Sequence, residues 1–155
     1  MIPRISQLPQ VSTEYKKFLT VLKSKAFSGD IEDRYPARLL CATDNSVYQC
    51  LPAAVIFPKT VADIALALTI AGDKEFSSII FAPRGGGTGT NGQSLNKGIM
   101  IDCSRYMKEY RDFNAENREI TVQAGVIKDE LNEFLKPHAL FFSPELSTSS
   151  RATIG

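Results

Sequence analysis

The stretch P-R-G-G-G-T-G-T-N-G, residues 83–92, contains five of the ten glycines in this chain of 155 residues. It follows residues 78–82 (SIIFA), an apolar run that predicts a buried strand. Glycine allows a positive φ and has no Cβ, so such a loop can point several backbone N–H groups at one anion. The guanidinium of Arg84 and the hydroxyls of Thr88 and Thr90 would add charge and donors. The stretch therefore predicts a phosphate- or dinucleotide-binding loop at a strand end, with a flexible turn as the alternative.

Two standard phosphate-binding motifs do not fit this loop. A Walker A motif ends in Gly-Lys-Ser/Thr, but Gly92 is followed by Gln93 and carries no such lysine. Residues 87–92 match the Rossmann pattern GxGxxG, which must open a crossover helix of ten or more residues. Only five residues separate Gly92 from Gly98, where the next strand is predicted. The loop is therefore expected to lie between two strands with no long helix after it.

The rest of the chain alternates between predicted helices and strands. Thr60 and Asp63 form a capping-box pattern before a helix, and Gly29 is expected to stop the first helix. Strand, helix and strand in succession predict a parallel βαβ unit around residues 54–82. Residues 30–52 are expected to be irregular. The predicted helices are residues 12–27, 61–71 and about ten residues from 127, and the predicted strands are 54–57, 79–82, 98–102 and 119–124.

Composition excludes several classes of protein. The net charge is +1 with no basic block, which argues against nucleic-acid binding, and no apolar run reaches the length of a membrane span. Three widely spaced cysteines favour reduced thiols in a cytoplasmic protein. With no C-x-x-C and a single histidine, His138, no zinc or iron–sulfur site is expected within this chain. His138 itself is expected to be a surface or capping residue rather than a catalytic base.

A second loop, residues 143–150, is rich in hydroxyl side chains, and Thr153 and Gly155 continue its run of small residues. This composition suits close contact with a polar ligand, and it suits a solvated loop equally well. The chain stops at residues 151–155 (RATIG) with no charged or polar tail, and we expect this end to be a cut inside a folded unit.

Five stretches together carry a family likeness. In order and spacing over roughly residues 40–155, they resemble the FAD-binding domain of the vanillyl-alcohol-oxidase (PCMH-type) flavoproteins. Within that family the chain is most similar to bacterial FAD-linked 2-hydroxy-acid dehydrogenases of the large D-2-hydroxyglutarate dehydrogenase type, which also carry an iron–sulfur region. The stretches are AVIFPKTVADI, APRGGGTGTNG, GIMID, VQAGV and FSPELSTSSRATIG.

The resemblance implies an α+β fold with a small βαβ subdomain, flanking helices and the beginning of a second, mixed or antiparallel β subdomain. Residues 1–50 would be an N-terminal helix and extended lead-in, and residues 51–155 the N-terminal part of an incomplete FAD-binding domain. FAD is the implied cofactor. An iron–sulfur cluster would belong to a region outside this chain, and the chain itself would hold no metal.

The resemblance also implies where FAD lies. The glycine loop would bind the pyrophosphate through the backbone amides of Arg84 to Gly89, and the second loop would run beside the flavin and its ribityl chain. No catalytic residue is identified. The implied cofactor-binding residues are Pro83, Arg84, Gly85, Gly86, Gly87, Thr88, Gly89 and Thr90 in the first loop, and Pro144, Glu145, Leu146, Thr148, Ser149, Thr153 and Gly155 in the second.

The implied reaction is oxidation of a small 2-hydroxy acid, with D-2-hydroxyglutarate going to 2-oxoglutarate and the Cα hydride passing to flavin N5. The same family allows D-lactate, glycolate or a sugar lactone as substrate. A non-catalytic nucleotide-binding module is the alternative from another class. If the chain is a fragment, it is expected to bind FAD weakly or not at all, to be inactive alone, and to self-associate through an exposed apolar face.

Overall fold

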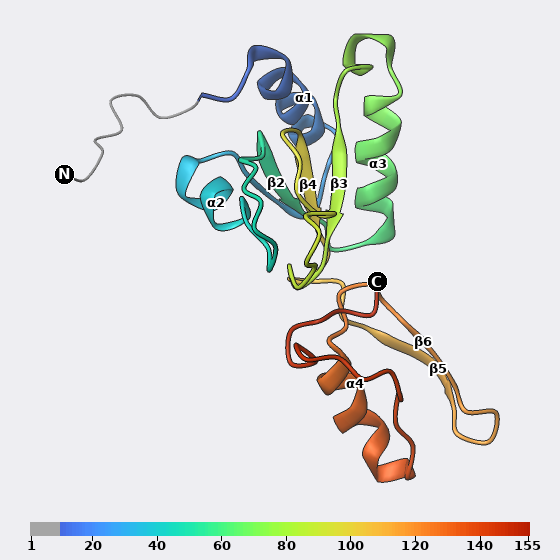
Figure 1. Ribbon diagram of the computed structural model, residues 1–155. Helices are drawn as coiled ribbons and strands as arrows, with labels where there is room; N and C mark the ends of the chain where they lie inside the picture. Colours follow the sequence, from blue (N-terminus) through green and yellow to red (C-terminus); the bar gives the residue numbers. More distant parts are fainter. Residues whose placement is uncertain (1–9) are drawn as a thin grey trace.

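The computed structural model describes residues 10–155, which form two lobes joined by one turn of chain. The first lobe, residues 10–106, contains a sheet with helices around it, and the second lobe, residues 107–155, contains a hairpin and a helix (Figure 1). The glycine loop and the C-terminal residues both lie where the two lobes meet. Elements distant in sequence are thereby brought to one place.

The first lobe is built on a four-stranded sheet in the order β1-β2-β4-β3. Strands β2, β3 and β4 are parallel, and β1 pairs antiparallel with β2. The predicted βαβ unit is therefore confirmed as parallel, but β4 lies between its two strands. The strands are β1 (Asp30–Glu32), β2 (Ala54–Phe57), β3 (Phe81–Arg84) and β4 (Ile99–Asp102).

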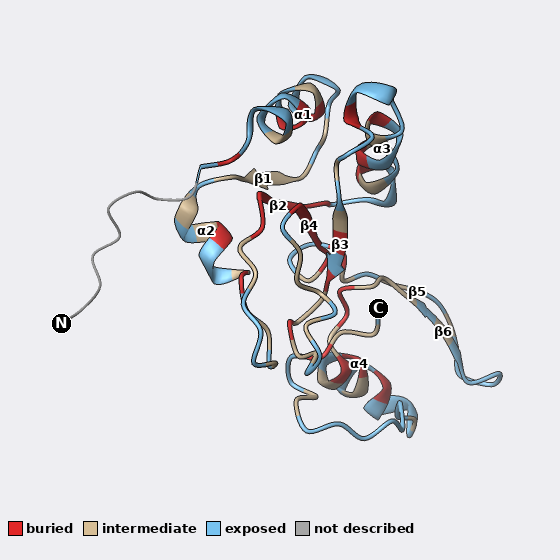
Figure 2. Cartoon of the chain, turned by 45° about the horizontal axis from the view of Figure 1, so that its top comes forward, coloured by how far each residue is buried: buried red, intermediate tan, exposed pale blue. Residues whose placement is uncertain are grey.

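Strands β2 and β4 are buried on both faces, as expected of parallel strands with continuous apolar sequences (Figure 2). On one face, Ile56 and Ile99 share a core with Phe18 of helix α1 (Thr13–Ser24) and residues of helix α3 (Val61–Ala71). On the other face, Met100 packs in a smaller cluster beside helix α2 (Tyr35–Leu40). A short 3₁₀ helix, η1 (Lys74–Phe76), closes the end of α3.

The buried carboxylate of Asp63 fixes the start of α3. The predicted capping box with Thr60 is present, and Asp63 also accepts hydrogen bonds from the amide and hydroxyl of Ser28 at 2.8 and 2.7 Å and from the amide of Lys59 at 2.9 Å. Burial raises the pKa of Asp63, but these hydrogen bonds outweigh it and leave the pKa below its ordinary value. One side chain thus joins the chain after α1 to the start of α3.

The second lobe packs a two-stranded antiparallel sheet against two helices. The strands are β5 (Tyr110–Asn114) and β6 (Glu119–Val122), and the helices are α4 (Lys128–Leu135) and the 3₁₀ helix η2 (Lys136–His138). Val126 and Leu131 are buried at its centre. The ring of His138 lies 4.6 Å from that of Phe113. His138 therefore has a packing contact on this lobe.

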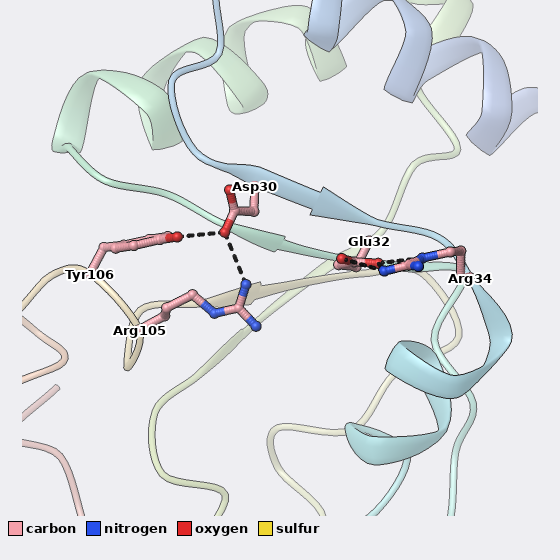
Figure 3. A network of polar contacts seen from close by, with 5 residues as sticks. All are labelled: Asp30, Glu32, Arg34, Arg105 and Tyr106. Atoms are coloured by element: carbon pink, nitrogen blue, oxygen red, sulfur yellow. Dashed lines mark hydrogen bonds and ion pairs between the residues drawn. The ribbon is translucent and has the colours of Figure 1, made fainter.

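The turn between the lobes is held to the sheet by a polar network (Figure 3). Asp30 of β1 accepts hydrogen bonds from the hydroxyl of Tyr106 at 2.6 Å and from the guanidinium of Arg105 at 3.0 Å. The same guanidinium stacks over the ring of Phe57, 3.4 Å from its centroid. The bond from Tyr106, followed by that from Arg105, lowers the pKa of Asp30. The turn therefore leaves the first lobe in a fixed direction.

Three predictions about local structure are wrong. Residues 30–52 are not wholly irregular, because β1 forms by pairing with β2, and α2 is a six-residue helix with a proline in its first turn. Gly29 does not stop α1, which ends at Ser24, with Ala26 in the left-handed conformation. Strand β3 begins and ends two residues later than predicted, since its pairing with β4 extends to Arg84.

Candidate functional site

The glycine loop leaves the carboxyl end of β3 and opens onto a cavity of about 440 Å³ at the junction of the lobes. The first lobe contributes the loop and the residue after β4, and the second lobe contributes one residue shortly after β6 and two at the end of the chain. Of the residues predicted from sequence, the cavity is lined by Pro83, Arg84, Gly85, Gly86, Gly87, Thr88, Gly89, Thr153 and Gly155. The sequence prediction missed Gln93, Ser94, Cys103 and Ala124.

The backbone amides of the loop are available to a ligand. Within residues 10–155, the six amides from Gly85 to Thr90 donate no hydrogen bond to a protein acceptor. Gly87 has a φ of 65°, which turns the chain so that successive amides are not taken up by a strand or helix. Neighbouring free amides of this kind form a concave anion-binding site. The loop is therefore a candidate anion-binding site that contains no lysine.

The loop also packs against the end of the chain, where no side chain would fit. A Cβ on Gly85 would overlap the hydroxyl of Thr153, and a Cβ on Gly86 would overlap the carbonyl oxygen of Arg151. The guanidinium of Arg151 in turn donates to the carbonyl oxygen of Gly86 at 3.1 Å. These two glycines are therefore needed for the close approach of the two loops.

The last four residues are held by the second lobe. The amides of Ile154 and Gly155 donate to the carbonyl oxygens of Val126 and Ala124 at 2.9 and 3.0 Å. The hydroxyl of Thr153 donates to the carbonyl oxygen of Gly155 at 2.9 Å. This pairing places Thr153 between its own lobe and the glycine loop, and so makes it part of the cavity wall.

The remaining predicted residues lie outside this cavity. Thr90 is exposed near the tip of the glycine loop. The hydroxyl of Ser149 donates to Asp129 at 3.0 Å, and the carbonyl oxygen of Thr148 accepts from the amides of residues 151 and 152. These contacts shape the second loop from within. Three further predicted residues are exposed on that loop: Pro144, Glu145 and Leu146.

The thiols near the site are kept neutral. Burial, and then the negative charge of Asp102, raise the pKa of Cys103, which lines the cavity. Burial also raises the pKa of Cys41, which lines a second cavity of about 320 Å³ that shares Arg84, Gly85 and Gly86 with the first. A neutral, buried thiol is a poor nucleophile, so neither cysteine is prepared for covalent chemistry.

Residues 10–155 contain no group of three or more histidine, cysteine, aspartate or glutamate side chains that could hold a metal ion. In the same part of the chain, every helix is too short or too polar to cross a bilayer.

The sequence pattern of a family described as "FAD binding domain" matches residues 52–155. The D-2-hydroxyglutarate dehydrogenase of Pantoea ananatis is 56% identical over all 155 residues, which cover 100% of this chain and 15% of that protein. A glycolate oxidase subunit of Bacillus subtilis is 30% identical over 128 residues, which cover 81% of this chain and 27% of that protein. The chain thus spans about 15% of the length of the more similar of these two relatives.

Among solved structures, an alkyldihydroxyacetonephosphate synthase superposes with a TM-score of 0.80 at 16% identity, covering 96% of this chain and 29% of that one. At this identity the likeness concerns the fold alone. The sequence and structure comparisons together confirm the expected resemblance to FAD-binding PCMH-type domains and the expected mixed fold.

Proposed function

This chain belongs to the FAD-binding domain family, and from that premise we propose that its glycine loop holds the pyrophosphate of FAD in a flavin-dependent 2-hydroxy-acid dehydrogenase. The observation that carries the proposal is the run of six amides, Gly85 to Thr90, that donate to no acceptor within residues 10–155. A pyrophosphate carries the negative charge and the many acceptor oxygens that such a run requires. The family whose sequence pattern covers this loop is an FAD-binding domain, so FAD is the cofactor that we assign to the loop.

The residues present fit this group. The cavity volume of about 440 Å³ lies in the usual range for small-molecule sites and suits part of a ligand as large as FAD. A side chain on Gly85 or Gly86 would collide with the second loop, so the glycines keep the wall thin where the two lobes meet. When bound, FAD would supply a flavin ring able to accept a hydride.

The chain's own contribution is to bind and orient. Amides of the first lobe would hold the pyrophosphate, while Thr153 and Ala124 of the second lobe would bound the same cavity from the other side. One ligand in contact with both lobes would fix their relative position. The hydroxyl of Thr88 lines this cavity and would add a donor to the amides, whereas the hydroxyl of Thr153 already donates to Gly155. No residue of this chain is assigned the role of the base that takes the substrate's hydroxyl proton.

Over 50% identity to a D-2-hydroxyglutarate dehydrogenase supports D-2-hydroxyglutarate as the substrate of the whole protein. The alternative, glycolate or D-lactate, is supported by the glycolate oxidase subunit and by a mitochondrial D-lactate dehydrogenase of Kluyveromyces lactis that is 33% identical over 95 residues. Dye reduction by the full-length protein, measured with each acid in turn, distinguishes them. We expect a kcat/KM at least tenfold higher for D-2-hydroxyglutarate, and a preference for glycolate or D-lactate would favour the alternative. Bound FAD with no turnover of any of these acids would favour a non-catalytic nucleotide-binding module.

Two further proposals concern the chain's surroundings. The free, partly or fully buried thiols support a reducing compartment, and we place the protein in the cytoplasm. Exposed apolar side chains such as Leu40, Val47 and Phe141 support self-association of the isolated chain. A monomer by light scattering at high concentration would count against the second proposal.

A further inference from the structure

We propose that Arg84 is a positioning residue that holds the glycine loop in shape from within the protein, and that it is not the counter-ion of the bound pyrophosphate. The inference rests on the proposed function, because it concerns how the same loop is prepared for FAD. It replaces the more obvious expectation that a cation beside a phosphate loop contacts the phosphate.

The geometry shows Arg84 joining three separate segments. Its side chain is only 9% exposed at the end of β3. One Nη atom donates to the carbonyl oxygen of Thr43 at 2.9 Å, and the other lies 3.5 Å from the hydroxyl oxygen of Ser94. A Cβ on Gly87 would overlap the guanidinium, so the loop backbone rests directly against it. A planar guanidinium with several donors can make all these contacts at once.

The positive charge of Arg84 also acts on a carboxylate inside the protein, Asp44. Burial raises the pKa of Asp44. The hydrogen bonds from Ser46 and the positive charge of Arg84 together lower this pKa by more, so that it lies below its ordinary value. The Oδ1 atom of Asp44 accepts from the Ser46 amide at 2.8 Å. Its Oδ2 atom is buried without a hydrogen-bond partner among residues 10–155. The positive charge of Arg84 therefore favours the ionised form of this half-buried carboxylate.

The turn that carries Thr43 and Asp44 lies outside the cavity lining but contacts the glycine loop. It closes on itself through a bridge between Thr43 and Gln49, and a Cβ on Gly92 would lie 3.0 Å from the ring of Tyr48. The turn thus touches the far end of the glycine loop directly and its beginning through Arg84. If Arg84 lost its contacts, the loop would keep its amides but lose the support that fixes their directions.

The test compares three variants of the full-length protein with a matched control, Lys16→Gln, which removes an exposed charge from α1. The dissociation constants of FAD and riboflavin are measured by flavin fluorescence. Arg84→Lys keeps the charge but not the planar fork, and Arg84→Gln loses both. We expect both to weaken FAD binding at least tenfold and to similar extents. FAD binding near the wild-type value in Arg84→Lys, with a loss only in Arg84→Gln, would overturn the inference.

Asp44→Asn leaves Arg84 in place and distinguishes the two roles by whether FAD binding becomes weaker or stronger. Under the positioning role, losing the nearby negative charge of Asp44 loosens Arg84 and weakens FAD binding several-fold. Under a counter-ion role, the freed charge would strengthen FAD binding, and that result would contradict the inference even if both Arg84 variants fail to fold.

Hydrogen exchange without FAD separates this inference from the proposed function. We expect faster exchange at the Cys50 and Leu95 amides, which bond to Ala42 and Gly92, in both Arg84 variants but not in Lys16→Gln. Unchanged exchange would refute the positioning role. A wild-type protein that binds FAD no more tightly than riboflavin would instead refute pyrophosphate binding, whatever the exchange shows.

Discussion

Replacing Gly85 by alanine tests whether the docking of the two loops shapes the cofactor site. A Cβ at this position would overlap the hydroxyl of Thr153 and lie 3.0 Å from its Cβ and 3.3 Å from the carbonyl oxygen of Gly155. Overpacking of this kind costs about 1–3 kcal/mol. If that cost falls on the arrangement that binds FAD, the dissociation constant rises about 5- to 150-fold. Flavin fluorescence titration of the Gly85→Ala variant of the full-length protein measures this dissociation constant.

The second replacement, Thr153→Ala, is the matched partner. It removes the overlapping hydroxyl and leaves only the two tight contacts, which a shift of a few tenths of an ångström relieves. As a single replacement, Thr153→Ala removes the hydrogen bond from this hydroxyl to the carbonyl oxygen of Gly155, which costs about 1 kcal/mol. The double variant should therefore bind FAD more tightly than Gly85→Ala. Wild-type affinity in Gly85→Ala, or no recovery in the double variant, would refute the role given to this contact.

Three other perturbations test separate parts of the structure. Gly87→Ala must place a side chain at a φ of 65° against the guanidinium of Arg84, so we expect a loss of at least about 1 kcal/mol in stability and weaker FAD binding; unchanged urea unfolding would contradict this. Asp63→Ala leaves several buried donors without their acceptor and should cost about 3 kcal/mol in urea at pH 7, while Asp63→Asn should cost less. Because the pKa of Asp63 is lowered in the folded protein, its contribution to stability is present above the ordinary value of 3.8 and is lost as the pH falls through the lower folded-state value. The difference in unfolding free energy between wild type and Asp63→Asn should therefore shrink in that acid range. A difference that stays constant would contradict the assignment. Cys103, whose pKa is raised by burial and by Asp102, should resist iodoacetamide at pH 7 and react once urea unfolds the protein; rapid labelling of the folded protein would show that the thiol is exposed.

Much of the first lobe could be predicted because its signals are local. The apolar runs of β2 and β4 and the capping box at Thr60 and Asp63 appear in the sequence and form as expected. β1 and α2 could not be predicted in the same way. β1 has three residues and exists through its pairing with β2, and α2 is too short for its periodicity to be recognised.

The candidate site was predicted in part for a similar reason. The glycines of the loop can be recognised from the sequence because they are clustered. Cys103 and Ala124 line the cavity only because the two lobes meet there, and no local sequence signal shows this. The role of Arg84 also depends on distant contacts, since Thr43 lies 41 residues earlier in the chain. The sequence suggested that Arg84 contacts the phosphate, because it lies next to the glycines. In the structure its guanidinium instead lies against Thr43, Ser94 and the backbone of Gly87.

The most direct test of the central claim is hydrogen exchange of the glycine loop with and without FAD. The six amides from Gly85 to Thr90 have no protein acceptor within residues 10–155, so they should exchange rapidly in the absence of FAD. If they hold the pyrophosphate, saturating FAD should slow exchange in peptides covering residues 85–90, and riboflavin, which has no phosphate, should not. Bound FAD with no protection of these amides would contradict the account.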